Sequence, residues 1–298
     1  DIPRDIFISG HNSSPLSVDL SRLIKDEKDI FQTGLNVLKK LTEGNVYLTL
    51  RSSMEFDNVI TQTISGPHPS GNVGIQIHHT KPLRPGDVIW SVNAQHVITL
   101  GKLFQTGSYD PTVIVSIGGS GATSPSTVKT ITGVNIGLLV EEQNLKEPIR
   151  LISGDVLTGK TVENADFLGF YDSSVSIIND DVKRPFLGML SPGSSRTKYS
   201  LTNAFLSFGN KAFNFTSSQN GELRAMVPLN AWEDVLPMDI YPNPLYRAIL
   251  AQDIEEMEKL GIWECDDEDF ALCSFACPSK IDVGGVVRDG LDLMEKEG

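Results

Sequence analysis

The chain has 298 residues, 40% of them hydrophobic and 21% charged, which is the composition of a globular protein large enough for two or three domains. Its 38 acidic and 25 basic residues leave a net charge of −13, so we expect no nucleic-acid partner, because a phosphate backbone would be repelled. Three cysteines make no disulfide framework and indicate a reducing cytoplasm, and the apolar runs fall far short of the ~20 residues that cross a bilayer.

The first 125 residues alternate between strand and helix patterns. The β-rich runs Asp5–Ser9 and Val46–Leu50 flank an amphipathic stretch at residues 30–41. A second helix is predicted at residues 88–104, and a strand at residues 112–117 leads into a Gly/Ser/Pro cluster that we expect to close the domain. Strands alternating with helices predict an α/β domain with a parallel sheet covered by helices.

Among the histidines of this region, His68 is a candidate for a site. His68 lies between Pro67 and Pro69 in a tight turn, and this turn either positions a loop against its neighbour or brings His68 and Pro69 to a ligand. His78 and His79 are adjacent, and in a strand they would point to opposite faces, which disfavours joint metal binding.

Residues 126–215 carry short strand patterns around one short helix pattern. The strands are predicted at residues 128–132, 150–153, 175–178 and 186–190, and the helix at residues 136–143. This ratio of strand to helix is typical of a small α+β domain.

Two glycine-rich segments resemble nucleotide-binding loops. The segment from Gly154 to Thr161 satisfies the P-loop pattern G-x4-G-K-[ST], but a poor helix follows it and Asp155 would place a carboxylate among amides that must receive phosphates. We therefore expect a β-hairpin here rather than a P-loop enzyme. Gly118 and Gly119 belong to the second segment, which fails the dinucleotide pattern and is expected to be a linker.

After residue 215 the pattern becomes helical. Helices are predicted at residues 245–260, 266–276 and 283–296, approached by several prolines. Residues 253–297 hold fourteen Asp or Glu against four Lys or Arg, so most of the negative charge lies here. The acidic residues form either a solvated helical face or a docking surface for a basic partner.

The last helical region contains half of an iron–sulfur motif. Cys273, Cys277 and Pro278 reproduce the C-x3-C-P half of the bacterial motif C-x2-C-x2-C-x3-C-P. Asp267 and Phe270 stand at the two other ligand positions, where neither a carboxylate nor a phenyl ring can supply a thiolate. We expect no iron–sulfur cluster and no other metal in this chain.

We expect apolar side chains to fill the space that such a cluster would occupy, namely Leu272, Phe275 and Ala276. With Cys265, the cysteines have the spacing C-x7-C-x3-C, which does not match the common zinc patterns, although a zinc site with a remote histidine is an alternative. The simpler interpretation is that the three thiols are buried as small hydrophobic groups.

Four collinear segments make the chain resemble a known family. The segment at residues 264–280, Glu-Cys-Asp-Asp-Glu-Asp-Phe-Ala-Leu-Cys-Ser-Phe-Ala-Cys-Pro-Ser-Lys, resembles the NqrA subunit of the sodium-translocating NADH:quinone oxidoreductases. So do Gly-Pro-His-Pro-Ser-Gly at residues 66–71, the segment at residues 88–104, and Arg-Ala-Met-Val-Pro at residues 224–228. The resemblance implies kinship with the Rnf-complex C subunit. It also implies that this chain is a C-terminal fragment, since the family carries further residues upstream.

The resemblance also implies a fold for each region. It implies a partial Rossmann-like parallel-sheet domain at residues 1–125, a β-grasp, soluble-ligand-binding domain at residues 126–215, and a helical domain related to α-helical ferredoxin at residues 216–298.

The function implied is that of a peripheral subunit on the cytoplasmic face of the bacterial inner membrane. Its complex couples electron transfer from NADH to ubiquinone to Na⁺ export, with NADH, flavins, iron–sulfur centres and ubiquinone held by other subunits. This chain, without redox cofactor or catalytic residue, would act in assembly, docking and quinone contact, for which His68, Pro69, Phe275 and Lys280 are the candidate residues. The alternative is a free-standing cytoplasmic protein that binds a small ligand in its β-grasp domain.

Overall fold

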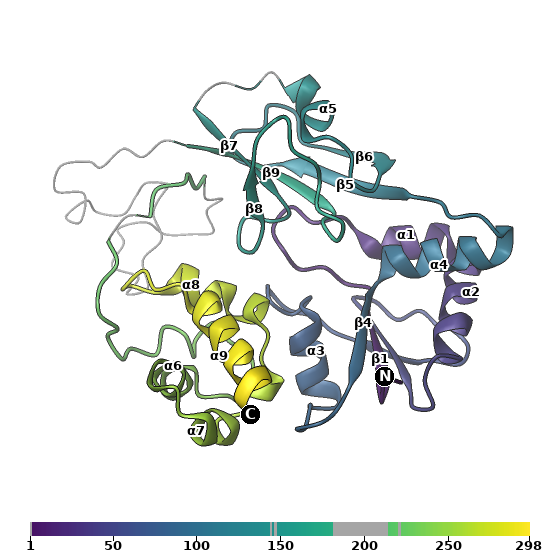
Figure 1. Cartoon of the computed structure of the whole chain (residues 1–298). Coiled ribbons are helices and arrows are strands. Elements are labelled where there is room, and N and C mark those ends of the chain that lie inside the picture. Colours follow the sequence, from purple (N-terminus) through teal and green to yellow (C-terminus); the bar gives the residue numbers. More distant parts are fainter. Residues whose placement is uncertain (1, 144, 146–147, 181–213, 220–221) are drawn as a thin grey trace.

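The computed structural model describes residues 2–143, 145, 148–180, 214–219 and 222–298. Figure 1 shows three groups of elements: a parallel sheet with helices, a mixed sheet, and a set of C-terminal helices. Each group has its own cluster of buried apolar side chains. A mixed α/β architecture with a parallel sheet, as predicted, is confirmed for the first group.

The first group alternates strands and helices along the chain. Its elements are β1 Asp5–Ser9, α1 Leu20–Asp26, α2 Lys28–Lys39, β2 Val46–Leu50, β3 Ile60–Thr63, α3 Val73–Thr80, β4 Ile89–Asn93 and α4 Ala94–Thr106. All neighbouring strands are parallel, in the order β3-β2-β1-β4. Strand β1 is central and reads Asp-Ile-Phe-Ile-Ser, with almost every side chain buried, because helices cover both faces of a parallel sheet.

Helices α2 and α4 lie on one face of this sheet and α3 on the other (Figure 1). The α2–α4 pair is packed backbone to backbone. A Cβ added at Gly34 would lie 2.2 Å from the carbonyl oxygen of Val97, and one added at Gly101 would lie 2.0 Å from that of Ile30. Among the described helices, α3 is the one that contacts β1 on the opposite face.

Two predictions in this group were wrong. Residues 88–104, predicted as one helix, form β4 and then α4, because Ile89 and Val92 pair with β1 and the side chain of Asn93 caps α4 by accepting the N–H of Gln95 at 2.8 Å. His78 and His79 lie on helix α3 rather than in a strand, so they do not point to opposite faces of a sheet.

The second group is a five-stranded mixed sheet in the order β6-β5-β9-β7-β8. Its elements are β5 Thr112–Gly118, β6 Ser126–Ile131, α5 Ile136–Val140, the 3-10 turn Glu141–Gln143, β7 Ile149–Ser153, β8 Lys160–Val162 and β9 Ser174–Asn179. Strand β5 therefore belongs to this sheet and not to the first one, because it pairs antiparallel with β6 and parallel with β9. The glycines after β5, predicted as a linker between domains, instead lie in the connection between two paired strands.

The β-hairpin predicted in place of a P-loop is confirmed. Strands β7 and β8 pair antiparallel, with Ser153 opposite Lys160, so Lys160 and Thr161 lie on a strand and not at the start of a helix. Asp155 folds the intervening turn by accepting the N–H groups of Leu157 and Thr158. The strand predicted at residues 186–190 lies outside the described residues.

The third group is helical. Its elements are α6 Pro242–Ala251, α7 Ile254–Lys259, the 3-10 turns Ile262–Glu264 and Asp267–Phe270, α8 Ala271–Ala276 and α9 Val283–Glu297. The helix predicted at residues 245–260 is broken, because Gln252 takes a positive φ of 56° and Asp253 caps α7. The core here gathers Phe270, Trp232 and the three cysteines.

Candidate functional site

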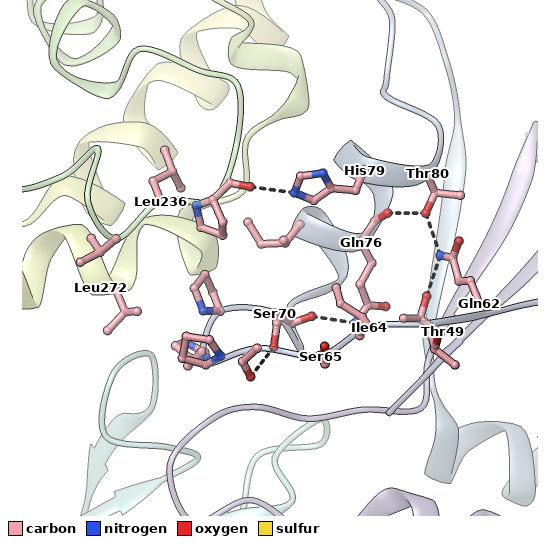
Figure 2. Close-up of a pocket in the computed structure, with 18 of the residues that line it drawn as sticks. Thr49, Gln62, Ile64, Ser65, Ser70, Gln76, His79, Thr80, Leu236 and Leu272 are labelled. Atoms are coloured by element: carbon pink, nitrogen blue, oxygen red, sulfur yellow. Dashed lines mark hydrogen bonds between the residues drawn. The ribbon is translucent and has the colours of Figure 1, made fainter. Parts of the chain in front are cut away.

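A cavity of about 760 Å³ opens between the parallel sheet and residues 222–298, which we call the helical segment. One wall is made by β3, the turn at residues 66–70 and helix α3, and the other by residues 233–237 and Leu272. Figure 2 shows Leu236 and Leu272 across the cavity from Thr49, Gln62 and Thr80. The cavity thus occupies the part of the sheet face that α3 leaves uncovered.

The sheet wall of the cavity carries an ordered chain of hydrogen bonds. Gln62 Nε2 donates to Thr49 Oγ1 at 2.8 Å and to Thr80 Oγ1 at 2.7 Å, and the Thr80 hydroxyl donates to the carbonyl of Gln76 at 2.6 Å (Figure 2). The buried Gln76 amide in turn donates to Ser9 Oγ at 3.0 Å. Both amide hydrogens of Gln62 are engaged, so its Oε1 is left as an acceptor.

Apolar surface comes from Ile64 and Ile75 on one side and from Val235, Leu236, Pro237 and Leu272 on the other. Glu233 and Asp234 add two carboxylates to the second wall. A cavity of this size with mostly apolar walls and a few oriented polar groups suits a small, largely apolar ligand with a polar end.

The turn that carries His68 forms one side of the cavity. His68 Nδ1 lies 3.1 Å from Ser13 Oγ, which also accepts the N–H of Gly71 at 2.7 Å. Because the Ser13 hydroxyl has one hydrogen to give, the arrangement favours donation to Nδ1 and a hydrogen on Nε2. Burial lowers the pKa of His68, which keeps the ring neutral. Its Nε2 is buried and has no hydrogen-bond partner among the described residues.

Helix α3 joins the sheet to the helical segment through its two histidines. His78 accepts the N–H of Asp239 on Nε2 at 3.0 Å, so its hydrogen is on Nδ1, which lies 2.8 Å from Glu264 Oε2. His79 Nε2 lies 2.8 Å from the carbonyl oxygen of Pro237 and must be the donor, because a carbonyl only accepts (Figure 2). His79 therefore holds Pro237, which lines the cavity, and His78 holds residues just beyond it.

A buried carboxyl group lies at the start of the same helix. Asp269 is 1% exposed, and an added Cβ at Gly74 would lie 1.9 Å from its Oδ2. Neither oxygen has a hydrogen-bond partner in the described part of the chain. Burial raises the pKa of Asp269 to about 7, outweighing a smaller opposing effect of Asn72.

Comparison with known proteins identifies the family. Residues 1–109 match a family model described as "NqrA second alpha/beta domain", and residues 114–164 match one described as "NQRA C-terminal domain" and labelled SLBB. The chain is 40% identical to a protein of Hahella chejuensis over 99% of this chain and 68% of that protein, and 39% identical to one of Pasteurella multocida with the same coverage. Both of these relatives are named as the A subunit of a "Na(+)-translocating NADH-quinone reductase".

This chain belongs to the NqrA family. A NAD⁺-reducing [NiFe]-hydrogenase is a distant structural match, with a TM-score of 0.45 and 11% sequence identity. The match covers 60% of this chain and 41% of the hydrogenase chain, and it assigns neither fold nor function. Among the described residues, no helix is both long and apolar enough to span a membrane.

The half-motif of this NqrA family member does not fit an iron–sulfur cluster. Asp267 forms an ion pair with Arg288, and Phe270, 1% exposed, fills the core. Cys273 and Cys277 are free and buried, as the simpler interpretation predicted, and burial raises the pKa of Cys273 to about 12. Within the described ranges no group of three or more His, Cys, Asp or Glu could hold a metal ion.

The other candidate contact residues do not all meet at the cavity. His68 and Pro69 line it. Phe275 does not, and the prediction that it fills the space of the cluster was wrong: its side chain is 42% exposed and meets Phe215 edge-on, with ring centroids 5.7 Å apart. Lys280 takes a positive φ of 58° in the turn before α9. Sequence reasoning missed Gln62 and the other hydrogen-bonded polar residues of the sheet wall, for which the sequence shows no pattern.

Proposed function

We propose that this chain, at the cytoplasmic face of the inner membrane, serves as the peripheral NqrA subunit of a Na⁺-translocating NADH:quinone reductase. The observation that carries the proposal is identity of about 40% over almost the whole chain with proteins of that kind. Other subunits would hold NADH, flavins and iron–sulfur centres, and this chain would act in assembly, docking and quinone contact. The family assignment leaves a free-standing ligand-binding protein without support.

We also propose finer names for the three groups of elements. The parallel sheet with helices on both faces supports a Rossmann-like domain, and the five-stranded sheet with α5 supports a β-grasp domain. The half-motif at Cys273 and Cys277 supports a relation of the helical segment to α-helical ferredoxin. For the first boundary we propose a position near residue 110 in place of 125, which is supported by the place of β5 in the second sheet and by the gap between the family matches.

The cavity beside α3 is the place where we expect this chain to contact quinone. A quinone has a flat apolar ring with two carbonyl oxygens, which need hydrogen-bond donors, and an apolar tail. His68 lines one side of the cavity, and its buried Nε2–H, which has no partner among the described residues, would become a donor to a bound quinone once the side chains that cover it move. Ile64, Ile75 and Leu236 supply apolar surface. A neutral histidine donates to a carbonyl oxygen without bringing a charge into an apolar site.

The test of quinone contact is a calorimetric titration of the chain with ubiquinone-1. Ser65 is exposed and lines the cavity, so Ser65→Trp should fill the opening without disturbing the core and abolish binding. His68→Ala should weaken binding about tenfold, the effect of one lost hydrogen bond. Ser108→Trp, at an exposed site far from the cavity, is the control and should bind as the wild type does. Equal binding by all four proteins would contradict the assignment of this cavity.

The role in the complex is tested separately. Affinity-tagged chain expressed with the genes of a relative's other subunits should co-purify with them from detergent-solubilised membranes. Recovery of the tagged chain by itself, from cells that assemble those subunits, would overturn the proposed function.

A further inference from the structure

The segment between β8 and β9 exposes aromatic side chains. Phe170 is 56% exposed and Tyr171 is 79% exposed. The ring of Phe170 stacks on His96 of α4, with centroids 5.5 Å apart and planes at 10°, and Tyr171 meets both rings edge-on. We call His96, Phe170 and Tyr171 the aromatic surface. Large exposed aromatic groups in contact with each other are typical of protein interaction sites.

A rigid backbone presents this surface. Leu168 is buried and its N–H donates to the carbonyl of Val134 at 2.9 Å. The N–H of Gly169 donates to Ser153 Oγ at 3.0 Å, and this hydroxyl donates to Asp172 Oδ2 at 2.5 Å. A Cβ on Gly169 would lie 2.3 Å from the same carboxylate oxygen, so the segment packs closely. Side chains held in this way lose little conformational entropy when a partner binds.

The segment that carries Phe170 and Tyr171 is acidic. Residues 154–172 contain four carboxylates, on Asp155, Glu163, Asp166 and Asp172, against one cation on Lys160. The helical segment adds to this field. Desolvation, and then repulsion by Asp266 and Asp267 and by Asp155 and Asp172, raises the pKa of Glu268 to about 7. Arg288 pairs with Asp266 and Asp267, which leaves Glu268, Asp155 and Asp172 as the carboxylates of the two groups that repel one another and would be stabilised by a further cation.

We propose that the aromatic surface docks a basic segment of a neighbouring subunit, with an arginine or lysine side chain over the ring of Phe170 or Tyr171. Guanidinium and ammonium groups stack on aromatic faces, and the surrounding carboxylates favour the same charge. This inference rests on the proposed function, because the neighbouring subunit is part of the same complex.

The experiment is retention of the tagged chain on the membrane subunits during washes of rising NaCl concentration. The variant Phe170→Ala/Tyr171→Ala should bind about tenfold more weakly than the wild type and be released at lower salt. Glu163→Lys reverses one exposed charge and should also lower the salt concentration of release. Tyr109→Ala is the matched control, since Tyr109 is an aromatic side chain with 58% exposure that lies outside the aromatic surface.

Each outcome bears on one proposal. The four proteins should have the same melting temperature, because no buried side chain is changed. Earlier release of a variant would then result from its altered surface and not from unfolding. Retention of the double variant equal to that of Tyr109→Ala would overturn the inference while the role in the complex stands. Failure of the wild type to bind the membrane subunits would instead overturn the proposed function.

Discussion

Replacing Asp269 by Asn should stabilise the protein, by an amount that depends on pH. The carboxyl group is almost fully buried against helix α3, and its pKa is raised from 3.8 to about 7. Below pH 3.8 it is protonated in both the folded and the unfolded chain. Between pH 3.8 and 7 the unfolded chain ionises while the folded chain does not, so the folded state loses stability as pH rises, and above pH 7 the loss is complete.

The size of this effect follows from the shift in pKa. About three pKa units at 1.36 kcal/mol each give an upper limit of about 4 kcal/mol at pH 8, and almost no effect at pH 4. Asparagine has nearly the same shape and no charge to bury, so Asp269→Asn should gain stability in the same range of pH in which the wild type loses it.

Urea unfolding followed by tryptophan fluorescence would measure the free energy of unfolding at pH 5 and pH 8. Asp57→Asn, at an exposed carboxyl group, is the control and should change stability by less than about 0.5 kcal/mol at either pH. An advantage of Asp269→Asn that is the same at both pH values, or a variant less stable than the wild type at pH 8, would refute the reasoning.

Three further experiments test the packing and the hairpin. Gly74→Ala should destabilise the protein by about 1–3 kcal/mol, because its Cβ would collide with Asp269. In a chain that already carries Asp269→Ala, the same substitution should cost much less. An equal cost of Gly74→Ala in the wild type and in the Asp269→Ala variant would count against the contact. Phe270→Ala should lower the free energy of unfolding by about 3–5 kcal/mol, and Phe275→Ala should lower it far less, because Phe270 is buried and Phe275 is exposed. A larger loss for Phe275→Ala in urea unfolding would be inconsistent with this core. Lys160→Ala should change stability by less than about 0.5 kcal/mol, and micromolar ATP binding by the wild type that vanished in this variant would contradict a structural hairpin.

The sequence predicted those helices and strands whose own apolar pattern indicates their type. Helix α2 was found because its buried residues recur at helical spacing and face one sheet, and β1 and β2 because they are short runs of mostly buried, mostly apolar residues. The hairpin at Lys160 was predicted because the residues after the P-loop pattern make a poor helix, and Asp155 within it would repel a phosphate.

The errors have a common physical reason. The residues around Trp90 have enough apolar side chains for either a helix or a strand, and pairing with β1 decides between them. Strand β5 follows α4 directly in sequence, and only its pairing with β6 and β9 places it in the second sheet. Local pattern contains no information about such partners.

The candidate site was predictable only in part. His68 and Pro69 attracted notice because a histidine between two prolines is unusual, and both line the cavity. Gln62 and Asp269 could not be recognised, since each depends on a contact with a residue distant in sequence or on burial by another segment. The same holds for the exposure of Phe275, which the motif around it did not indicate.

The two walls of the cavity come from parts of the chain about 160 residues apart, around residues 62–80 and 233–237. Any ligand that touches both walls therefore acts as a reversible cross-link between the sheet and the helical segment. At a concentration one hundred times its dissociation constant, such a ligand would add about 2.7 kcal/mol to the stability of their association. Occupancy would then be reported by slower hydrogen exchange in α3 and α6, well beyond the atoms that the ligand touches.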